Sequence, residues 1–198
     1  SAMDMLNFMK SRRSTRKFRD NPVEEEKLAQ VVEAGCYAPS GGNNQSWHFV
    51  VIQKKEVLVK LAELVQHAFC EMDYDETTYA SLVNSIRLSK KGGYVFHYGA
   101  PVLIVVTNKK GYGNAMADSA CALENMMLMA NALDLGSCWI NQLHWLDENS
   151  CIRTYLKQFD VTDGETICGA IALGYADTKD GLPDRSPLPR KEIRITRV

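Results

Sequence analysis

The longest apolar stretch of the chain, residues 115–135, most narrowly limits what the chain can fold into. Its alanine, leucine and methionine side chains surround the helical wheel almost completely, whereas a surface helix carries a single apolar stripe. Between residues 115 and 133, Asp118, Glu124, Asn125 and Asn131 interrupt the stretch. No uninterrupted apolar run therefore approaches the ~20 residues of a membrane span. We predict a central helix that Gly136 ends and that packs on several sides, including a subunit interface.

Short β-rich runs alternate with segments of helical spacing along the rest of the chain. Strands are predicted at 47–52, 101–106, 137–140 and 166–175, with an edge strand at 193–198. Helices are predicted from Asp4, from Asn21 as N-cap with Pro22 at the first helical position, at 56–69, within 71–93, and from Asp147 to about residue 159. This order predicts one α/β or α+β domain with a mixed sheet, spanning residues 1–198.

Charge and cysteine content exclude several classes of protein. The 198 residues include 23 Lys and Arg against 24 Asp and Glu, a net charge of -1, which argues against a nucleic-acid-binding module. The six cysteines contain no C-x-x-C pair, so we expect reduced thiols in a cytoplasmic protein, mostly as small buried side chains. Neither they nor the four histidines have zinc-ligand spacing, and we assign no metal. Because no positively charged segment leads into an apolar stretch at the N-terminus, we expect no signal peptide, and Ser1 to Met3 is compatible with a cloning scar.

The near-neutral total conceals a strongly basic segment close to the N-terminus. Six basic residues and no acidic one lie between residues 10 and 19, interleaved with three hydroxyl residues. Guanidinium groups donate paired charge-assisted hydrogen bonds to phosphate, and hydroxyl groups add neutral ones. The segment therefore suits a phosphate, although a solvated basic face explains the same charges, and no Walker A or G-x-G-x-x-G loop is present. A second basic segment, residues 185–198, has five bases against one acid, and one phosphate could draw the two segments together.

A loop rich in glycine and amide side chains precedes the first predicted strand. Its sequence is Ala38-Pro39-Ser40-Gly41-Gly42-Asn43-Asn44-Gln45-Ser46-Trp47. Two glycines permit close backbone approach, and three successive amide side chains offer hydrogen-bond donors and acceptors. Such a loop could bind the edge of a planar heterocycle that carries alternating N–H and C=O groups. An ordinary surface turn is the alternative.

Four motifs, taken together, resemble the FMN-dependent nitroreductase family. They are Arg12-Arg13-Ser14-Thr15-Arg16-Lys17-Phe18, Ala38-Pro39-Ser40 through Gln45-Ser46-Trp47-His48-Phe49, Gly136-Ser137-Cys138-Trp139-Ile140, and Ala172-Leu173-Gly174-Tyr175. Their order and spacing match the family from about Leu6 to Ile195, nearly the whole chain. The resemblance implies a three-layer α+β fold, with a central mixed, mainly antiparallel sheet flanked by helices. It also implies an intertwined homodimer with FMN at the subunit interface.

The resemblance further implies residue roles. The phosphate and ribityl end of FMN is bound by the residues matching Arg12, Arg13 and Ser14. The residue matching Arg16 lies near the N1/C2 carbonyl edge of the flavin, where a cation stabilises negative charge. The partner subunit supplies the residues matching Pro39, Ser40, Gly41, Asn43 and Gln45. The segment matching Cys138, Trp139, Ile140 and Asn141 runs past the N5 side of the flavin ring. A basic residue late in the chain that contacts the phosphate matches Arg185 or Arg190.

The function that this resemblance implies is that of an FMN oxidoreductase. It would take a hydride from NADH or NADPH and pass two electrons, with ping-pong kinetics, to a nitroaromatic, quinone or enone-type acceptor. Because the flavin carries this chemistry, no side chain is expected to act as a catalytic nucleophile. Two alternatives stay open: a non-catalytic flavin carrier or sensor on the same fold, and a relative that acts as a reductive dehalogenase or destroys its flavin.

Overall fold

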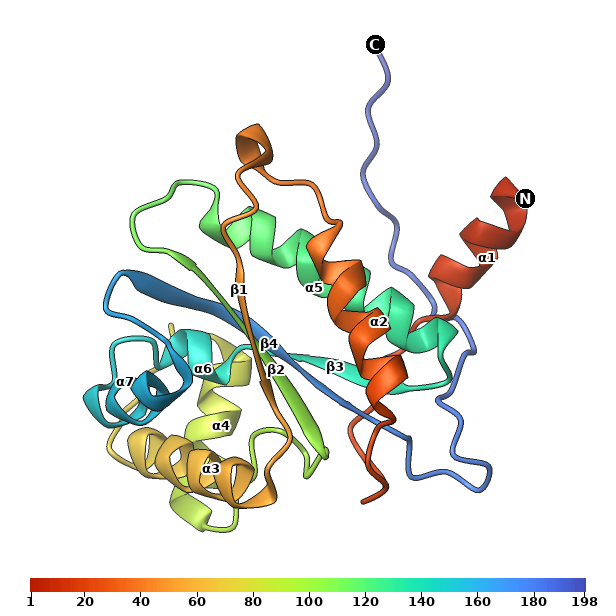
Figure 1. Cartoon of the computed structure of the whole chain (residues 1–198). Helices are drawn as coiled ribbons and strands as arrows, with labels where there is room; N and C mark the ends of the chain where they lie inside the picture. Colours follow the sequence, from red (N-terminus) through yellow and green to blue (C-terminus); the bar gives the residue numbers. More distant parts are fainter.

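A four-stranded antiparallel sheet forms the centre of the molecule in the computed structural model, which describes residues 1–198 (Figure 1). The strands run in the order β1 (His48–Ile52), β2 (Val102–Lys109), β4 (Glu165–Gly174) and β3 (Gly136–Ile140). The two central strands, β2 and β4, are almost completely buried, as their continuous apolar sequences require. All four predicted internal strands are therefore confirmed. The one parallel pairing is an isolated bridge between Ser14 and Ser137.

Helices cover both faces of the sheet, which gives three layers (Figure 1). One face carries α2 (Glu25–Cys36) and α5 (Ala115–Ala132), and the other carries α3 (Lys55–Cys70), α4 (Ala80–Lys91), α6 (Gln142–Trp145) and α7 (Ser150–Leu156). The alternation of side chains along β2 separates the two cores: Leu103 and Val105 point to the α3 side, while Ile104 and Val106 point to the α5 side. The α+β architecture expected from the sequence is thus present.

Helix α5 is the predicted central helix. Its buried residues include Leu123, Met126 and Met127, and it packs against α2 and against the sheet. Its outer face nevertheless includes the exposed residues Met116 and Cys121. Within one chain, α5 is therefore covered on several sides but not on all of them.

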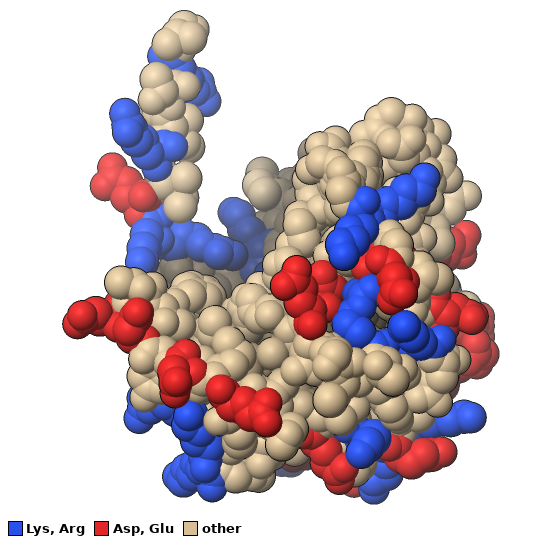
Figure 2. All heavy atoms as spheres, turned by 90° about the vertical axis from the view of Figure 1, so that its left-hand side faces the viewer, with Lys and Arg blue, Asp and Glu red and all other residues tan.

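Both ends of the chain stand away from this body (Figure 1). Helix α1 (Ala2–Ser11) has no buried residue, although Met3, Met5 and Met9 are apolar. The chain after Leu182 has no secondary structure; Pro183 is buried, and the exposed tail 187–198 projects beyond the molecule, where it carries basic side chains (Figure 2). None of the helices combines the length and apolar character needed to cross a membrane.

Several local predictions were wrong. Helix α2 begins at Glu25 rather than after Asn21, because Pro22 and Val23 stay outside the helix and Val23 packs into the core. The C-terminal segment 193–198 is not a strand, since no neighbouring strand in the chain is available to pair with it. Three of the six cysteines are exposed rather than buried, namely Cys36, Cys121 and Cys151.

The helix expected from Asp147 also differs in the structure. It is divided into α7 and the 3-10 turn η2 (Lys157–Phe159), and Asn149 rather than Asp147 caps it by accepting a hydrogen bond from Ile152 N. Asp147 faces β4 instead, where it accepts a hydrogen bond from Ile167 N.

Candidate functional site

The basic segment after α1 is fixed along the edge of the sheet. Thr15 N donates to Ser137 O at 2.9 Å, beside the bridge between Ser14 and Ser137, and Arg19 N donates to Tyr175 O at 2.9 Å. Gly136 makes the first contact possible, because a Cβ atom there would lie 2.6 Å from Thr15 Oγ1. The arginines therefore start from a backbone of defined position next to β3.

The second basic segment returns to the same place, as the charge pattern suggested. Arg13 Nη1 donates to Ser186 O at 2.7 Å and lies 3.2 Å from Asp184 Oδ2. Arg185 donates to the side chain of Asn131 at 3.1 Å and to its carbonyl oxygen at 2.6 Å. Residues from both ends of the chain thus meet at the C-terminal end of α5. We call Arg12, Arg13, Ser14, Arg16 and Arg185 the basic corner.

Several groups of the basic corner keep binding capacity. Arg12 makes one partly exposed ion pair, with Glu124 at 3.4 Å, and the exposed guanidinium group of Arg16 has no hydrogen bond or ion pair within the chain. Arg190 lies in the exposed tail and makes no side-chain contact with the corner. Of the two late arginines, only Arg185 therefore belongs to it.

Cys138 lies beside the basic corner and is buried. Burial raises the pKa of its thiol, while the charge of Arg16, the hydroxyl group of Ser14 and the charge of Arg12 act in the opposite direction. Because the net shift is upward, the thiol stays neutral near pH 7. Cys138 is therefore a neutral, buried residue beside the basic corner.

The remaining residues of the β3 motif have defined orientations. Trp139 Nε1 donates to Asn141 Oδ1 at 2.7 Å, so that the amide of Asn141 has its oxygen occupied and its Nδ2 donor free. Ile140 is buried in the core on the α3 side. Of Ile140 and Asn141, only Asn141 therefore offers a free polar group.

The amide-rich loop lies at the opposite end of α5. It contains the short 3-10 turn η1 (Gly41–Asn43), and the side chains of Pro39, Asn43 and Gln45 are exposed. Gly41 N donates to Asp118 in the first turn of α5, whereas Asn131 near its last turn donates to Ser11 Oγ, directly before the basic corner. Asp118 and Asn131 are separated by a rise of ~20 Å along the helix. The loop therefore lies well apart from the Arg13 and Arg185 end of the corner, whereas Arg12 reaches Glu124, a rise of ~9 Å from Asp118.

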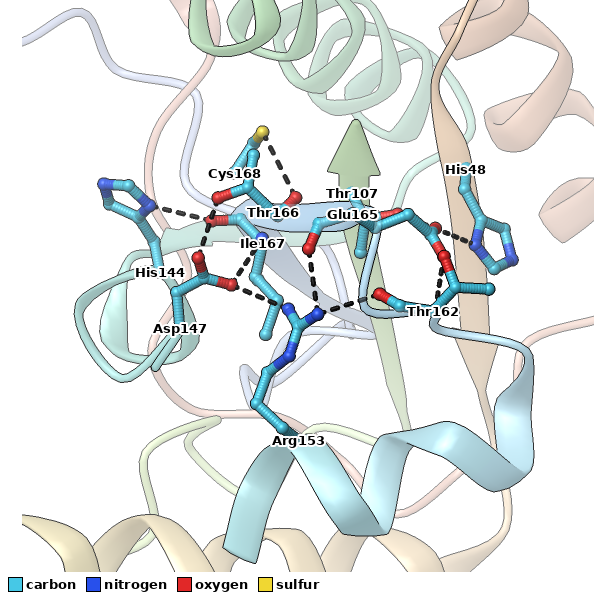
Figure 3. A network of polar contacts seen from close by, with 10 residues as sticks. All are labelled: His48, Thr107, His144, Asp147, Arg153, Thr162, Glu165, Thr166, Ile167 and Cys168. Atoms are coloured by element: carbon cyan, nitrogen blue, oxygen red, sulfur yellow. Dashed lines mark hydrogen bonds and ion pairs between the residues drawn. The ribbon is translucent and has the colours of Figure 1, made fainter. Parts of the chain in front are cut away.

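A second polar cluster lies at the β1, β2 and β4 ends remote from the corner (Figure 3). Glu165 accepts hydrogen bonds from Thr107 Oγ1 and Thr162 N and contacts His48 Nδ1, all at 2.5 Å. Arg153 joins Asp147 at 2.9 Å and donates to the carbonyl oxygens of Thr162 and Glu165. We call these residues the Glu165 network.

The pKa of Glu165 reflects how completely this network is paired. Burial on its own would raise the pKa, but the hydrogen bonds from Thr107, Thr162 and His48 outweigh it and lower the pKa to about 2. The side chain is 15% exposed. Its oxygens are occupied by partners within the chain, so the network holds secondary structure together and leaves little capacity for a ligand.

An apolar cavity of about 560 Å³ lies between α3 and the segment before β2. Its lining includes Leu58, Val59, His97 and Pro101, and it includes no residue that the sequence assigned to the site. The basic corner is instead an open surface of charged groups. Cavity size alone therefore does not locate the site suggested by the sequence.

Comparison with known proteins decides the family. The family model described as "Nitroreductase family" matches residues 9–175, which include the basic corner up to Arg16, the amide-rich loop and the β3 motif. The chain belongs to the nitroreductase family. This assignment confirms the family that the four sequence motifs indicated.

Three relatives illustrate the membership. A nitroreductase of Bacteroides fragilis, solved with bound FMN, is 32% identical with a TM-score of 0.84 over 98% of each chain. A Methanothermobacter thermautotrophicus protein, provisionally named NADH dehydrogenase/NAD(P)H nitroreductase, is 29% identical over 93% of this chain and 83% of its own length. The nitrobenzene nitroreductase of Ectopseudomonas oleovorans is 25% identical over 97% of this chain and 92% of its own length.

The sequence did not identify the polar residues that support the site. Asp118 and Asn131 were noted only as interruptions of an apolar stretch, yet both are buried and bind the loop and the basic corner, respectively. A polar side chain in a helix that is apolar on most sides needs a partner, since an unpaired buried polar group is costly. The polar residues within this apolar helix were therefore the sequence signal that could have pointed to buried hydrogen-bond partners.

Proposed function

We propose that the chain is an FMN-dependent NAD(P)H oxidoreductase whose basic corner holds the FMN phosphate. The observation that supports this most directly is the meeting of Arg13 with residues 184–186, which brings arginines from both ends of the chain to one place. Guanidinium groups and a serine hydroxyl suit a phosphate dianion. The donor set therefore fits the cofactor found in the Bacteroides fragilis relative.

Arg12, Arg13, Ser14 and Arg185 would hold the phosphate and ribityl end, and Arg16 would lie at the flavin ring. Arg16 has no partner within the chain, so its charge is free to stabilise negative charge on a bound ring. Asn141, which directly follows β3, has a free amide donor. FMN held there would supply two-electron chemistry between NADH or NADPH as hydride donor and a nitroaromatic, quinone or enone-type acceptor.

A homodimer completes this proposal. Helix α1 has no buried residue, and a helix of 10 residues is only marginally stable in water without packing. Apolar side chains of α1 and of the tail are exposed, such as Met3 at 64% and Ile195 at 77%. A second copy of the chain would cover them. The ~20 Å along α5 between the loop and the Arg185 end of the corner also fits a cofactor held between the corner of one copy and the loop of the other.

Anaerobic reduction tests the proposed activity. The purified protein is loaded with FMN and mixed with NADH or NADPH, and the flavin absorbance band is followed. An oxidoreductase bleaches the band rapidly, and a nitroaromatic or quinone then restores it without the nucleotide, as ping-pong kinetics require. Failure to bind FMN contradicts the proposal outright, and binding without rapid bleaching favours the carrier or sensor.

A further inference from the structure

A buried carboxylate holds the amide-rich loop from beneath. Asp118 is 5% exposed, and Gly41 N lies 3.1 Å from its Oδ1 and 3.2 Å from its Oδ2. Tyr112 donates its hydroxyl hydrogen to Asp118 Oδ2 at 2.6 Å. The carboxylate therefore has defined partners on the loop and on the segment between β2 and α5. We call Asp118 and Tyr112, with Gly41 between them, the loop clamp.

Tyr112 contacts the loop directly as well. Its hydroxyl oxygen accepts a hydrogen bond from Asn44 Nδ2 at 3.3 Å and lies 3.3 Å from Gly41 O. A Cβ atom on Gly41 would lie 2.6 Å from the Tyr112 hydroxyl and 2.5 Å from Asn114 Nδ2. A side chain on residue 41 would therefore displace the Tyr112 hydroxyl group and the Asn114 amide from these positions, so the glycine suits the clamp.

The loop that the clamp holds has an unfavourable backbone. Gly42 and Asn43 both have φ of 56°, and Gln45 has φ of 50°. The left-handed region costs a non-glycine residue roughly 1 kcal/mol or more, and such residues persist only where the surroundings enforce them. The side chains of Asn43, Asn44 and Gln45 are nevertheless exposed, so they contribute little packing in return. The strained backbone of the loop therefore exposes amide groups at the surface.

We propose that Asp118 and Tyr112 are positioning residues of the cofactor site and that they act across the subunit interface. The clamp of one copy fixes residues 40–45 in the conformation that contacts the cofactor held by the basic corner of the other copy. This inference rests on the proposed function. Neither residue is a catalytic residue, because both act through the loop.

Two substitutions test the positioning role. Asp118→Asn removes the negative charge and one of the oxygen acceptors, and we expect it to raise the Kd for FMN roughly tenfold. Tyr112→Phe removes only the hydroxyl contacts, leaves the buried carboxylate in place, and should raise the Kd about threefold. Asp147→Asn is the matched control, since Asp147 is also a hydrogen-bonded carboxylate but belongs to the Glu165 network. It should leave the Kd for FMN unchanged.

Mixed dimers separate positioning across the interface from a general loss of structure. A differently tagged Asp118→Asn chain and an Arg13→Ala chain are co-expressed, and the hybrid dimer is purified by both tags. One of its two sites then combines an intact corner with an intact loop, and the other combines both defects. We expect half of the sites to bind FMN with the wild-type Kd, although each parent homodimer binds weakly.

The outcomes distinguish the two proposals. If wild-type protein binds FMN but Asp118→Asn and Tyr112→Phe bind it equally well, the positioning role is wrong while the proposed function stands. If the hybrid dimer has only weak sites, corner and loop act within one chain and the interface role is wrong. If wild-type protein does not bind FMN at all, the proposed function itself fails.

Discussion

The basic corner and the Glu165 network are both polar, but they differ in how far the chain satisfies them. In the network, Glu165 and Asp147 are mostly buried and each accepts several hydrogen bonds from the chain (Figure 3). In the corner, Arg16 has no partner and Arg13 pairs with a carboxylate that is 60% exposed. Polar groups that pair only with one another stabilise a fold, whereas groups with remaining capacity can bind a ligand.

Charge balance shows the same difference. The network pairs Arg153 with Asp147, and both oxygens of the Glu165 carboxylate have partners within the chain. The corner gathers four arginines, which Glu124, Asp134 and Asp184 only partly offset. A bound phosphate dianion would more than offset the remaining positive charge. Substitutions in the network should therefore change stability, and substitutions in the corner should change cofactor affinity.

The largest effect on stability is expected for Arg153→Met. This change leaves the carboxylate of Asp147, which is 22% exposed, without its cation, and it leaves two carbonyl oxygens without a donor. Removing one partner of a mostly buried ion pair costs about 3 kcal/mol of the free energy of unfolding. Urea unfolding measures this loss. An unchanged unfolding midpoint would show that the network does not stabilise the fold.

Acid should weaken the network at Glu165. The pKa of Glu165 in the folded protein, about 2, lies below the ordinary value of 4.5, so its stabilisation is complete above pH 4.5 and disappears as the pH falls towards 2. The complete loss amounts to about 3 kcal/mol. Unfolding of wild type and Glu165→Gln is compared between pH 6 and about 2.5. The difference between the two proteins should shrink on acidification, and a constant difference would contradict the assigned pKa.

Arg13→Ala should weaken FMN binding strongly and change the stability of the protein very little. The loss of one charge-assisted contact to phosphate, worth about 1.5 to 2 kcal/mol, raises the Kd for FMN roughly 20-fold. The exposed pair with Asp184 contributes less than about 1 kcal/mol to stability, so unfolding without FMN is nearly unchanged. Fluorescence titration with FMN measures the Kd. A large loss of stability with an unchanged Kd would place Arg13 among structural residues.

The smallest effects decide between the two late arginines. Arg185→Ala removes a corner residue that Asn131 and Asp134 hold in place, and we expect a Kd for FMN about five times higher. Arg190→Ala changes a tail residue without contacts, and its Kd should stay within about twofold of wild type. The reverse order in the same titration would mean that the tail folds back onto the phosphate in the dimer.

The sequence predicted the elements whose pattern is local. β2 and β4 have continuous apolar runs, and α3 has a clear apolar stripe, so the burial of these elements follows from periodicity. The start of α2 could not be predicted in this way. Asn21 and Pro22 favour a helix start, but the packing of Val23 in the core keeps the preceding chain extended.

The same limit applies to the site. The arginines and the amide-rich loop are visible as composition, and their motifs identified the family. The partners that orient them, Asp118 for the loop and Asn131 for Arg185, come from one helix and are distant in sequence from what they bind. Which polar residue meets which loop depends on tertiary packing. A single sequence records only that these polar residues interrupt an apolar helix.

The affinity for FMN compared with that for riboflavin tests most directly whether the basic corner is a phosphate site. Riboflavin has the same ring system without the phosphate, so titration of both ligands isolates the contribution of the corner. We expect wild-type protein to bind one FMN per chain and to bind riboflavin about 100-fold more weakly. This preference should diminish in Arg13→Ala and persist in Arg153→Met. Equal affinity for the two flavins would contradict the assignment of the basic corner as a phosphate site. So would a preference for FMN that survives in the double variant Arg13→Ala/Arg185→Ala.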